Sequence, residues 1–135
     1  MIKKKLTELI DFPLIQDDCD LVVVQSPNIP FNIKRIYYII SPVKNLSRGY
    51  HAHKKNLQVV LCLKGSVKMI IDNGSIREEI ILSKPNKGIF LNKMIWHEMH
   101  EMDEDTILLV LASENFDEKD YIRNYGEFLE SVRKK

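Results

Sequence analysis

The residues best suited to chemistry are two histidines one position apart, His51 and His53, which are half of the four histidines in the chain. An apolar run at 59–63 follows almost at once, so the pair is expected at the start of a buried strand. Side chains at positions i and i+2 of a strand point to the same face, which sets the two imidazoles side by side. Adjacent imidazoles that line a pocket bind a metal, move protons or hold an anion.

The residues around this pair are similar to the first motif of the cupin jelly roll. The shared elements are Gly49, His51, His53 and Gly65 at their characteristic spacing. Metal-binding cupins place a glutamate shortly after the second histidine, and here that position is taken by Gln58. A neutral amide is a poor partner for a divalent cation, so the expectation is that neither a metal nor any other cofactor is needed.

Metal binding nevertheless remains an alternative, because three histidines are able to bind zinc. The metal set would combine His51 and His53 with either His97 or His100. A third interpretation is that the histidines are only packed and hydrogen-bonded in the core.

A second, closer resemblance covers about residues 29–129. The chain resembles the sugar 3,4-ketoisomerases, small cupins that act on dTDP-4-keto-6-deoxy-D-glucose. The matching motifs are the segments 29–31, 34–39, 48–54, 96–100, 109–113 and 120–125, together with Gln58. The resemblance implies a dTDP-sugar isomerase of deoxysugar biosynthesis with no metal requirement. It also implies a jelly-roll homodimer, in some members with exchanged N-terminal strands.

The implied reaction suits histidine chemistry. Moving a ketone from C4 to C3 needs a base that removes the C3 proton, an enediolate intermediate and delivery of a proton to C4. Histidine, with an ordinary pKa of about 6.5, carries protons near neutral pH. The resemblance gives these roles to His51 and His53, and which of them acts at carbon is left open. Tyr37 is a further catalytic candidate, as a donor to the enediolate oxygen, or else a core aromatic.

The diphosphate and base of a dTDP-sugar need their own partners. Arginine matches phosphate oxygens with a planar fork of donors, which favours Arg48 and Arg35, with Lys54 a weaker candidate. Trp96 is expected to stack on the thymine or the sugar, or else to belong to the core.

His97 bears on the stereochemistry of the product. The stretch 96–100 resembles the branch that forms 3-keto-6-deoxygalactose, so the galacto product is favoured over gluco and His97 is included among the substrate-binding residues. Against this, family members often carry an arginine and a glycine near the N-terminus, where this chain has Asp18 and Cys19 within the stretch 16–21.

The elements that position these residues are mostly short strands. Apolar and β-branched runs separated by glycine, proline and asparagine turns predict strands at 5–12, 21–24, 33–40, 59–63, 67–71, 76–82, 89–91, 94–100 and 107–111. Asn73-Gly74 predicts a hairpin with a type I′ turn. Helical spacing of apolar residues predicts one helix over 117–133, capped by Asp117. The fold class is therefore all-β, a cupin jelly roll with a short C-terminal helix, in a single domain over 1–135 whose strands in 1–30 are candidates for exchange.

Composition excludes several other classes. The 20 basic and 19 acidic side chains give a formal net charge of +1, so there is no basic excess for nucleic acid or a membrane surface. The chain has no signal peptide, no apolar run of membrane-spanning length and only two cysteines, which predicts a cytoplasmic protein with reduced thiols. The expected partners are a dTDP-sugar and a second copy of the chain. The rivals are a metal-dependent small cupin, a non-catalytic sugar-nucleotide-binding cupin and, less well matched, a 3,5-epimerase.

Overall fold

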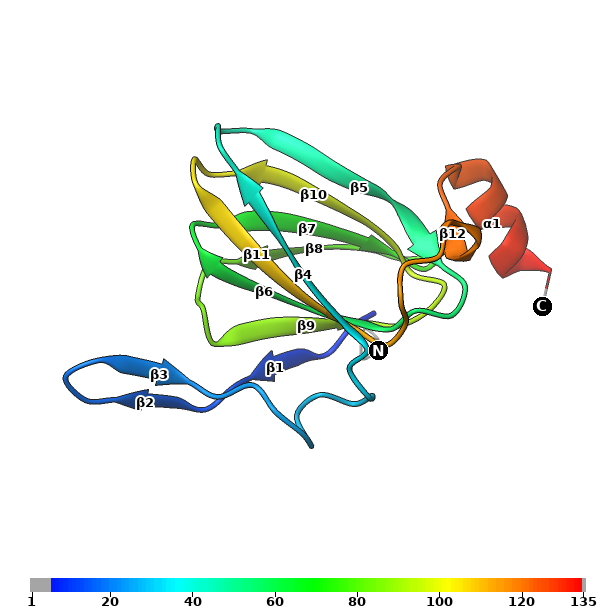
Figure 1. Ribbon diagram of the computed structural model, residues 1–135. Helices are drawn as coiled ribbons and strands as arrows, with labels where there is room; N and C mark the ends of the chain where they lie inside the picture. Colours follow the sequence, from blue (N-terminus) through cyan, green and yellow to red (C-terminus); the bar gives the residue numbers. More distant parts are fainter. Residues whose placement is uncertain (1–5, 135) are drawn as a thin grey trace, which may run out of the picture.

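The computed structural model describes residues 6–134, and the start of the predicted first strand at residue 5 lies outside that range. Two antiparallel five-stranded sheets face each other (Figure 1). The first has the order β1 (Leu9–Asp11), β9 (Lys87–Leu91), β6 (Gln58–Lys64), β11 (Thr106–Ala112), β4 (Arg35–Ser41). The second has the order β12 (Tyr121–Ile122), β5 (Leu46–His53), β10 (Trp96–Met102), β7 (Val67–Asp72), β8 (Arg77–Leu82). The predicted all-β antiparallel architecture is confirmed.

The core lies between the two sheets. β4 and β8 alternate between exposed and half-buried positions, as expected of strands with one face in water, while the first five residues of β6 are all buried. The main cluster joins side chains of both sheets, among them Val60, Met69, Ile71, Leu108 and Val110. Cys62 is buried in the same cluster as a small hydrophobe, as its place in an apolar run predicts.

The predicted hairpin between β7 and β8 is confirmed, but its turn is not of type I′. That turn requires positive φ at both central residues, and of the pair only Gly74 has one, at 96°. The side chain of Asn73 accepts hydrogen bonds from the backbone N–H groups of Ser75 and Ile76, which widens the connection to the four residues 73–76.

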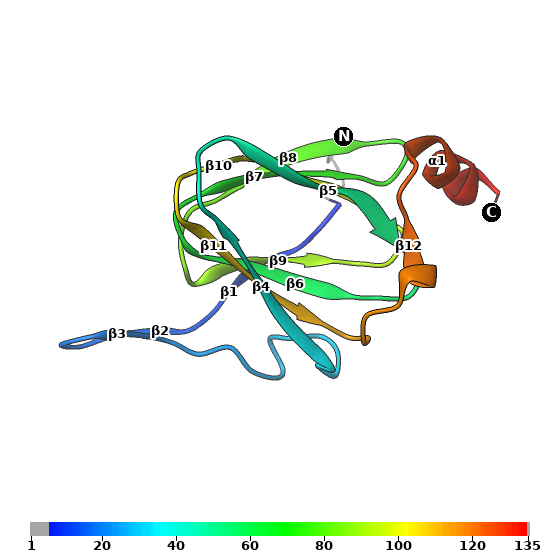
Figure 2. The same ribbon diagram turned by 45° about the horizontal axis from the view of Figure 1, so that its top comes forward.

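The predicted C-terminal helix begins too early. Helix α1 runs over Tyr125–Arg133, and its N-cap is Asn124, whose side chain accepts from the Glu127 N–H. Asp117 caps only a short 3₁₀ turn, η1 (Glu118–Asp120), and β12 then pairs with the end of β5. The helix covers the outer face at that end of the sandwich, where Phe128 packs with Ala52, Trp96 and Ile122 (Figure 2).

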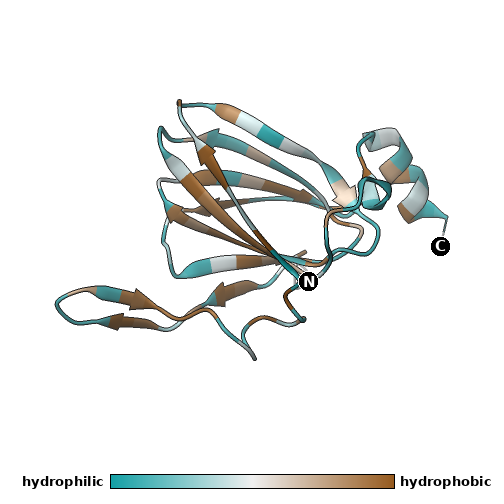
Figure 3. Cartoon of the chain, viewed as in Figure 1, coloured by the Kyte–Doolittle hydropathy of each residue, from teal (hydrophilic) through white to brown (hydrophobic). Residues whose placement is uncertain are grey.

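The N-terminal strands divide into two parts. β1 pairs with β9 at the edge of the first sheet, whereas β2 (Leu14–Gln16) and β3 (Asp20–Val22) pair with each other in a hairpin that projects away from the two sheets (Figure 1). The strands of this hairpin are largely apolar (Figure 3). Within residues 6–134, no helix has both the length and the apolar character needed to cross a membrane.

Candidate active site

Three of the four histidines meet inside the sandwich. β5 and β10 are neighbours, and His51 is paired in register with His97. The ring centroid of His51 lies 4.9 Å from that of His53 and 4.5 Å from that of His97. The alternation of β5 sends Ala52 to the opposite face, against the C-terminal helix. The predicted pairing of the two β5 imidazoles is confirmed, and His97 is the third member of the cluster.

Gly49 permits the close approach of β5 to β10. Its φ is 92°, and a Cβ at this position would lie only 3.0 Å from the carbonyl oxygen of His97. The register between the strands shifts between His97 and Glu98, next to this contact. The glycine of the motif is therefore required by the backbone that holds the histidines.

Each imidazole of the cluster is fixed through Nδ1. His51 Nδ1 lies 3.0 Å from the Gly49 carbonyl oxygen, His53 Nδ1 lies 3.0 Å from an Asp120 carboxylate oxygen, and His97 Nδ1 lies 3.4 Å from the Ile95 carbonyl oxygen. Because these oxygens only accept, the hydrogen of each neutral ring lies on Nδ1 and the lone pair on Nε2. The ligand nitrogens of the three rings lie within 4.8 Å of one another, so the site gathers three bases.

Burial keeps these bases neutral. It lowers the pKa of His51 to about 4, although the hydrogen bond to Gly49 opposes the change. Burial also lowers the pKa of His53, against the opposing effect of Asp120, and lowers that of His97 well below its ordinary value. At neutral pH all three rings are therefore uncharged, each with one nitrogen that carries no hydrogen.

Tyr37 approaches from β4 in the opposite sheet. Its hydroxyl oxygen accepts a hydrogen bond of 2.7 Å from the side-chain amide of Gln58, so its own hydrogen remains available to another acceptor. Burial raises the pKa of Tyr37, aided by Tyr121 and opposed by Arg35. The phenol is thus a neutral donor at physiological pH.

A pocket of about 310 Å³ opens between β4 of the first sheet and β5 of the second. Among the described residues, its lining contains three arginines and no carboxylate. Within residues 6–134, Arg35 Nε is buried without a hydrogen-bond partner, whereas Arg123 makes a two-pronged ion pair with Glu118 at 2.9 and 3.1 Å. Such a lining suits an anionic ligand. The lining residues are Arg35, Tyr37, Ile39, Arg48, Gly49, His51, Met99, Phe116, Tyr121 and Arg123.

Comparison with known proteins identifies this arrangement. The family profile described as "FdtA: WxcM-like, C-terminal" matches residues 5–133. The chain belongs to the FdtA family. The TDP-4-oxo-6-deoxy-alpha-D-glucose-3,4-oxoisomerase of Aneurinibacillus thermoaerophilus is 43% identical over 129 residues, which are 94% of this chain and 93% of that protein.

Two solved structures agree with this assignment. A 3,4-ketoisomerase from Helicobacter canadensis superposes with a TM-score of 0.90 at 39% identity, covering 94% of this chain and 97% of the other. QdtA, a sugar 3,4-ketoisomerase from Thermoanaerobacterium thermosaccharolyticum solved in complex with TDP, has a TM-score of 0.91 at 42% identity, covering 96% of each chain. The family expected from the sequence motifs is confirmed, and with it the cupin jelly roll and an enzyme of the intramolecular oxidoreductase class.

Two predicted site residues lie elsewhere in this FdtA-family chain. Trp96 is 3% exposed on the outer face of β10, where it packs under helix α1 and donates to Glu98 at 2.8 Å. It occupies the strand position before His97 and therefore faces away from the pocket. Lys54 is exposed in the turn after β5 and does not line the 310 Å³ pocket. Arg35, Arg48 and Tyr37 line it with His51, as the sequence predicts.

Of the two histidines on β10, His97 belongs to the cluster and His100 does not. His100 lies on the outer face of β10, where its Nε2 is 2.8 Å from Glu98 and its Nδ1 is 3.1 Å from Ser47. A metal ion would therefore use His97 as the third nitrogen beside His51 and His53. Metal-binding cupins have a glutamate as a fourth, anionic ligand. Gln58 occupies that position here, but it is neutral and its amide is hydrogen-bonded to Tyr37.

The C-terminal segment supplies site residues that sequence analysis missed. The Tyr121 ring lies 4.9 Å from that of His51 and 4.6 Å from that of His53, and the Arg123 guanidinium stacks 4.1 Å above it. Asp120 binds His53, and Phe116 stands at the pocket wall. The stretch 120–125 is one of the motifs that carry the family resemblance. Because the sequence analysis assigns it to a helix, Tyr121 is expected on the apolar face of that helix and not in the pocket.

Proposed function

We propose that the chain is a dTDP-4-keto-6-deoxy-D-glucose 3,4-ketoisomerase that acts by histidine-mediated proton transfer. The observation that carries this proposal is the cluster of three neutral imidazoles beside a pocket whose lining has three arginines and no carboxylate. The activity named for the relative that is 43% identical gives the substrate class. Residues 1–135 act as one catalytic domain.

The reaction proceeds by two proton transfers without a net change in oxidation state. An imidazole Nε2 removes the proton from C3, which the C4 carbonyl acidifies, and the electron pair moves to form the enediolate. Tyr37 donates its free hydroxyl hydrogen to the oxygen that becomes negative, since Gln58 already occupies its acceptor side. A proton is then delivered to C4, and the hydrogen of the C3 hydroxyl replaces the one that Tyr37 gave to the C4 oxygen, so that C3 becomes the new carbonyl and C4 carries the hydroxyl.

The diphosphate binds to the arginines of the pocket. Arg35 presents a buried Nε that has no hydrogen-bond partner within residues 6–134, and Arg48 lies on β5 at the other side of the pocket. Arg123 is already paired with Glu118, so its contribution to binding is weaker.

The proposed product is dTDP-3-keto-6-deoxy-D-galactose. The support is His97, a third imidazole 4.5 Å from His51 that brings a base or acid to a second side of the site. Asp18 and Cys19, which replace the family's arginine and glycine, lie at the tip of the projecting β2–β3 hairpin and do not line this chain's pocket.

The same hairpin supports a homodimer. A two-stranded hairpin alone is marginally stable in water, and this one exposes Leu14, Ile15 and Leu21. On β4, the outward-facing Ile36, Tyr38 and Ile40 are 58–66% exposed. A second copy that receives the hairpin buries these surfaces. A dimer measured by light scattering, converted to a monomer by a paired Ile15→Glu and Leu21→Glu change, is the expected result.

The activity is tested by NMR of dTDP-4-keto-6-deoxyglucose in D₂O with chelator-treated protein. We expect a 3-keto sugar with deuterium at C4, and the coupling at C4 distinguishes galacto from gluco. His51→Ala should abolish turnover. His100→Ala is the matched control, because that histidine lies on the outer face and should leave turnover intact.

A metal-dependent cupin is the second candidate, favoured by the convergence of three nitrogens within 4.8 Å. It predicts no turnover after chelation and recovery when a divalent ion is added. Absence of turnover under both conditions, with dTDP still bound, would instead indicate a binding module.

A further inference from the structure

The stretch from Asp120 to Tyr125 carries part of the pocket wall. Tyr121 and Arg123 both line the pocket, and the Tyr121 ring lies 4.9 and 4.6 Å from the rings of the two β5 histidines. Asp120 precedes these two wall residues at the end of η1, and Tyr125 follows them as the first residue of α1. The position of the wall residues therefore depends on how the two ends of this short stretch are held.

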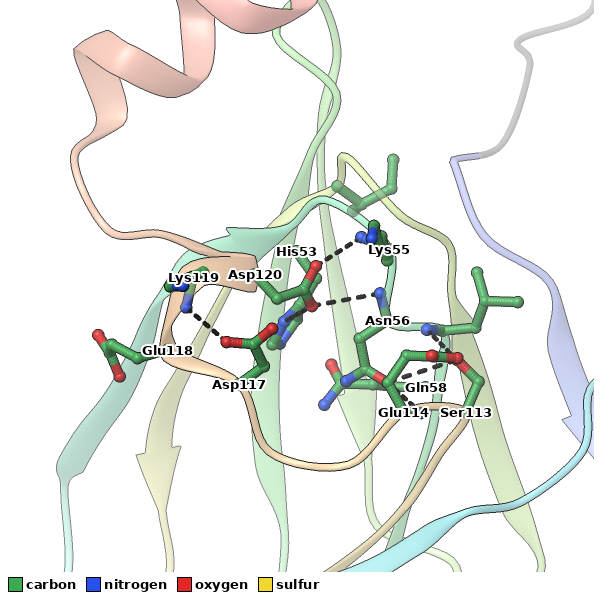
Figure 4. Close-up of polar contacts among 12 residues, drawn as sticks. His53, Lys55, Asn56, Gln58, Ser113, Glu114, Asp117, Glu118, Lys119 and Asp120 are labelled. Carbon is green, nitrogen blue, oxygen red and sulfur yellow. Dashed lines mark hydrogen bonds and ion pairs between the residues drawn. The ribbon is translucent and has the colours of Figure 1, made fainter.

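The first anchor of the stretch is Asp120 (Figure 4). One oxygen of its carboxylate accepts from the N–H of Lys55 at 2.7 Å. The other oxygen lies 3.0 Å from His53 Nδ1 and accepts from the N–H of Asn56 at 3.3 Å. The carbonyl of Asp120 accepts from the N–H of Lys54 at 3.0 Å. This end of the stretch is thus tied to the end of β5 and the turn that follows it.

The second anchor is a hydrogen bond between α1 and the end of β7. The Tyr125 hydroxyl donates to Asp72 Oδ2 at 2.6 Å, and this bond raises the pKa of Tyr125, so the hydroxyl keeps its hydrogen at neutral pH. The Asp72 side chain is only 4% exposed. It also accepts from the N–H of Gly74 at 2.6 Å and from Arg77 Nη1 at 3.1 Å. The β7–β8 hairpin therefore holds the acceptor in place for Tyr125.

Apolar packing alone would not locate the start of α1 as closely. The Trp96 ring lies 5.2 Å from the ring of Tyr125 and 5.8 Å from that of Phe128. Such contacts hold the helix against the sheet, but the hydrophobic effect has no preferred direction. A short hydrogen bond between a phenol and a fixed carboxylate does have one, so it sets where Tyr125 lies along the sheet.

We propose that Tyr125 is a positioning residue, which holds Tyr121 and Arg123 in the pocket wall through its hydrogen bond to Asp72. The inference rests on the proposed function for the identity of the ligand. Only residues 121–124 separate the two anchors, so release of Tyr125 reaches both wall residues and loosens the pairing of β12 with β5. A ligand that needs the closed wall then binds more weakly, in proportion to the fraction of molecules in which the wall is open.

The first test measures amide hydrogen exchange of the full-length protein without ligand. A hydrogen bond shifts an opening equilibrium by roughly 2- to 10-fold, so exchange in β12 should be faster by that factor in Tyr125→Phe than in wild type. Tyr50→Phe is the matched control, because the Tyr50 ring packs against His100 at 5.6 Å and lines neither the pocket nor α1. Exchange in β12 of this control should equal that of wild type.

The second test asks whether the helix and the pocket are coupled. Trp96 is the one tryptophan of the chain and lies under α1, on the side of β10 away from the pocket. Because coupling between two sites is reciprocal, dTDP should change the Trp96 fluorescence of wild type, and change it less in Tyr125→Phe.

Kinetics distinguish positioning from a purely structural role, when measured well below the unfolding temperature. Tyr125→Phe should weaken dTDP binding roughly 2- to 10-fold. It should lower kcat/KM more than kcat, since saturating substrate itself closes the wall. A residue that only stabilised the fold would leave both constants unchanged at such a temperature.

The outcomes separate the two proposals. Wild-type protein that neither binds dTDP nor isomerises the sugar would overturn the proposed function, and exchange in β12 would still decide whether Tyr125 holds the wall. Wild-type exchange in β12 of Tyr125→Phe would overturn the role of Tyr125. So would a variant that keeps both the dTDP affinity and the kcat/KM of an active wild type.

Discussion

The side-chain amide of Gln58 donates a 2.7 Å hydrogen bond to the hydroxyl oxygen of Tyr37. Gln58 is on β6 and Tyr37 is on β4, the two strands that flank β11 in the first sheet. The residue at the cupin glutamate position thus serves the phenol instead of a metal ion. An amide donor fills the acceptor side of the hydroxyl, which directs the Tyr37 hydrogen elsewhere. A glutamate at the same place would accept that hydrogen itself.

Gln58→Glu should therefore impair catalysis more than binding. We expect kcat to fall roughly tenfold or more, because the carboxylate competes for the Tyr37 hydrogen. Complete loss of a general acid costs ~10²–10⁴-fold, which is the upper bound of the effect. Steady-state kinetics would give kcat, and titration calorimetry the dTDP affinity. Tyr37→Phe in the Gln58→Glu background is the control, since little further loss is expected once the hydrogen is captured. A fully active Gln58→Glu enzyme would contradict this role.

Arg35 and Arg48 should account for diphosphate affinity. A hydrogen bond to a charged group contributes about 1.5–3 kcal/mol, so Arg35→Gln or Arg48→Gln should weaken dTDP binding roughly 10- to 100-fold. Lys54→Gln is the matched control, because Lys54 lies outside the pocket. Calorimetry with dTDP checks this prediction, and an equal loss in all three variants would indicate a diffuse charge effect.

Stability should fall as the pH is lowered from about 6.5 to 4. His51 takes up a proton near pH 6.5 in the unfolded chain but only near pH 4 in the folded protein, so over this range the unfolded state binds more protons. The difference corresponds to at most about 3 kcal/mol, less to the extent that the ring reaches water. Urea denaturation at several pH values should show a smaller decrease for His51→Gln than for wild type. Parallel curves would show that His51 titrates alike in both states.

Zinc should inhibit the enzyme even though the proposed reaction needs no metal. The three imidazoles offer nitrogens within 4.8 Å of one another, the kind of set that Zn²⁺ binds, and a bound ion would consume their lone pairs. His97→Asn should raise the zinc concentration needed for inhibition by at least roughly 10- to 100-fold. Loss of an outer-shell partner alone lowers metal affinity by that factor, and His97 would be a direct ligand. His100→Asn should leave the zinc response unchanged. Activation by zinc would favour the metal-dependent alternative.

Gly49→Ala should cost about 1–2 kcal/mol of stability or more. An alanine at positive φ is strained, and its Cβ would press on the His97 carbonyl. Thermal unfolding measures the loss, with Gly126→Ala in helix α1 as the matched control, expected to change stability by at most about 1 kcal/mol. Activity should also fall, since the strain lies between two members of the histidine cluster.

The strands were predictable because two-residue alternation and β-branched runs are strong signals. The segments predicted at 33–40, 67–71, 76–82, 94–100 and 107–111 correspond to β4, β7, β8, β10 and β11. The convergence of His51 and His53 followed from the strand period alone. The cupin resemblance added His97, whose distance from the pair in sequence is bridged by sheet pairing.

The missing part of the site came from one misassigned segment. Tyr121 and Ile122 fall by chance on the helical period of Tyr125 and Phe128, so 117–133 was interpreted as a single helix. Pairing of β12 with β5 outweighs that local preference. For Trp96 the sequence leaves both the pocket and the core open, because strand alternation gives two faces but does not say which one a helix will cover; the structure places it in the core.

The position of η1 and β12 after β5 and β10 in the chain determines when the site becomes complete during translation. A nascent polypeptide presents His51, His53 and His97 well before Asp120, Tyr121 and Arg123 leave the ribosome. Until then the jelly roll has its bases but lacks the carboxylate and the aromatic wall that orient them. The segment that completes the site is thus synthesised after every strand that carries a histidine of the cluster.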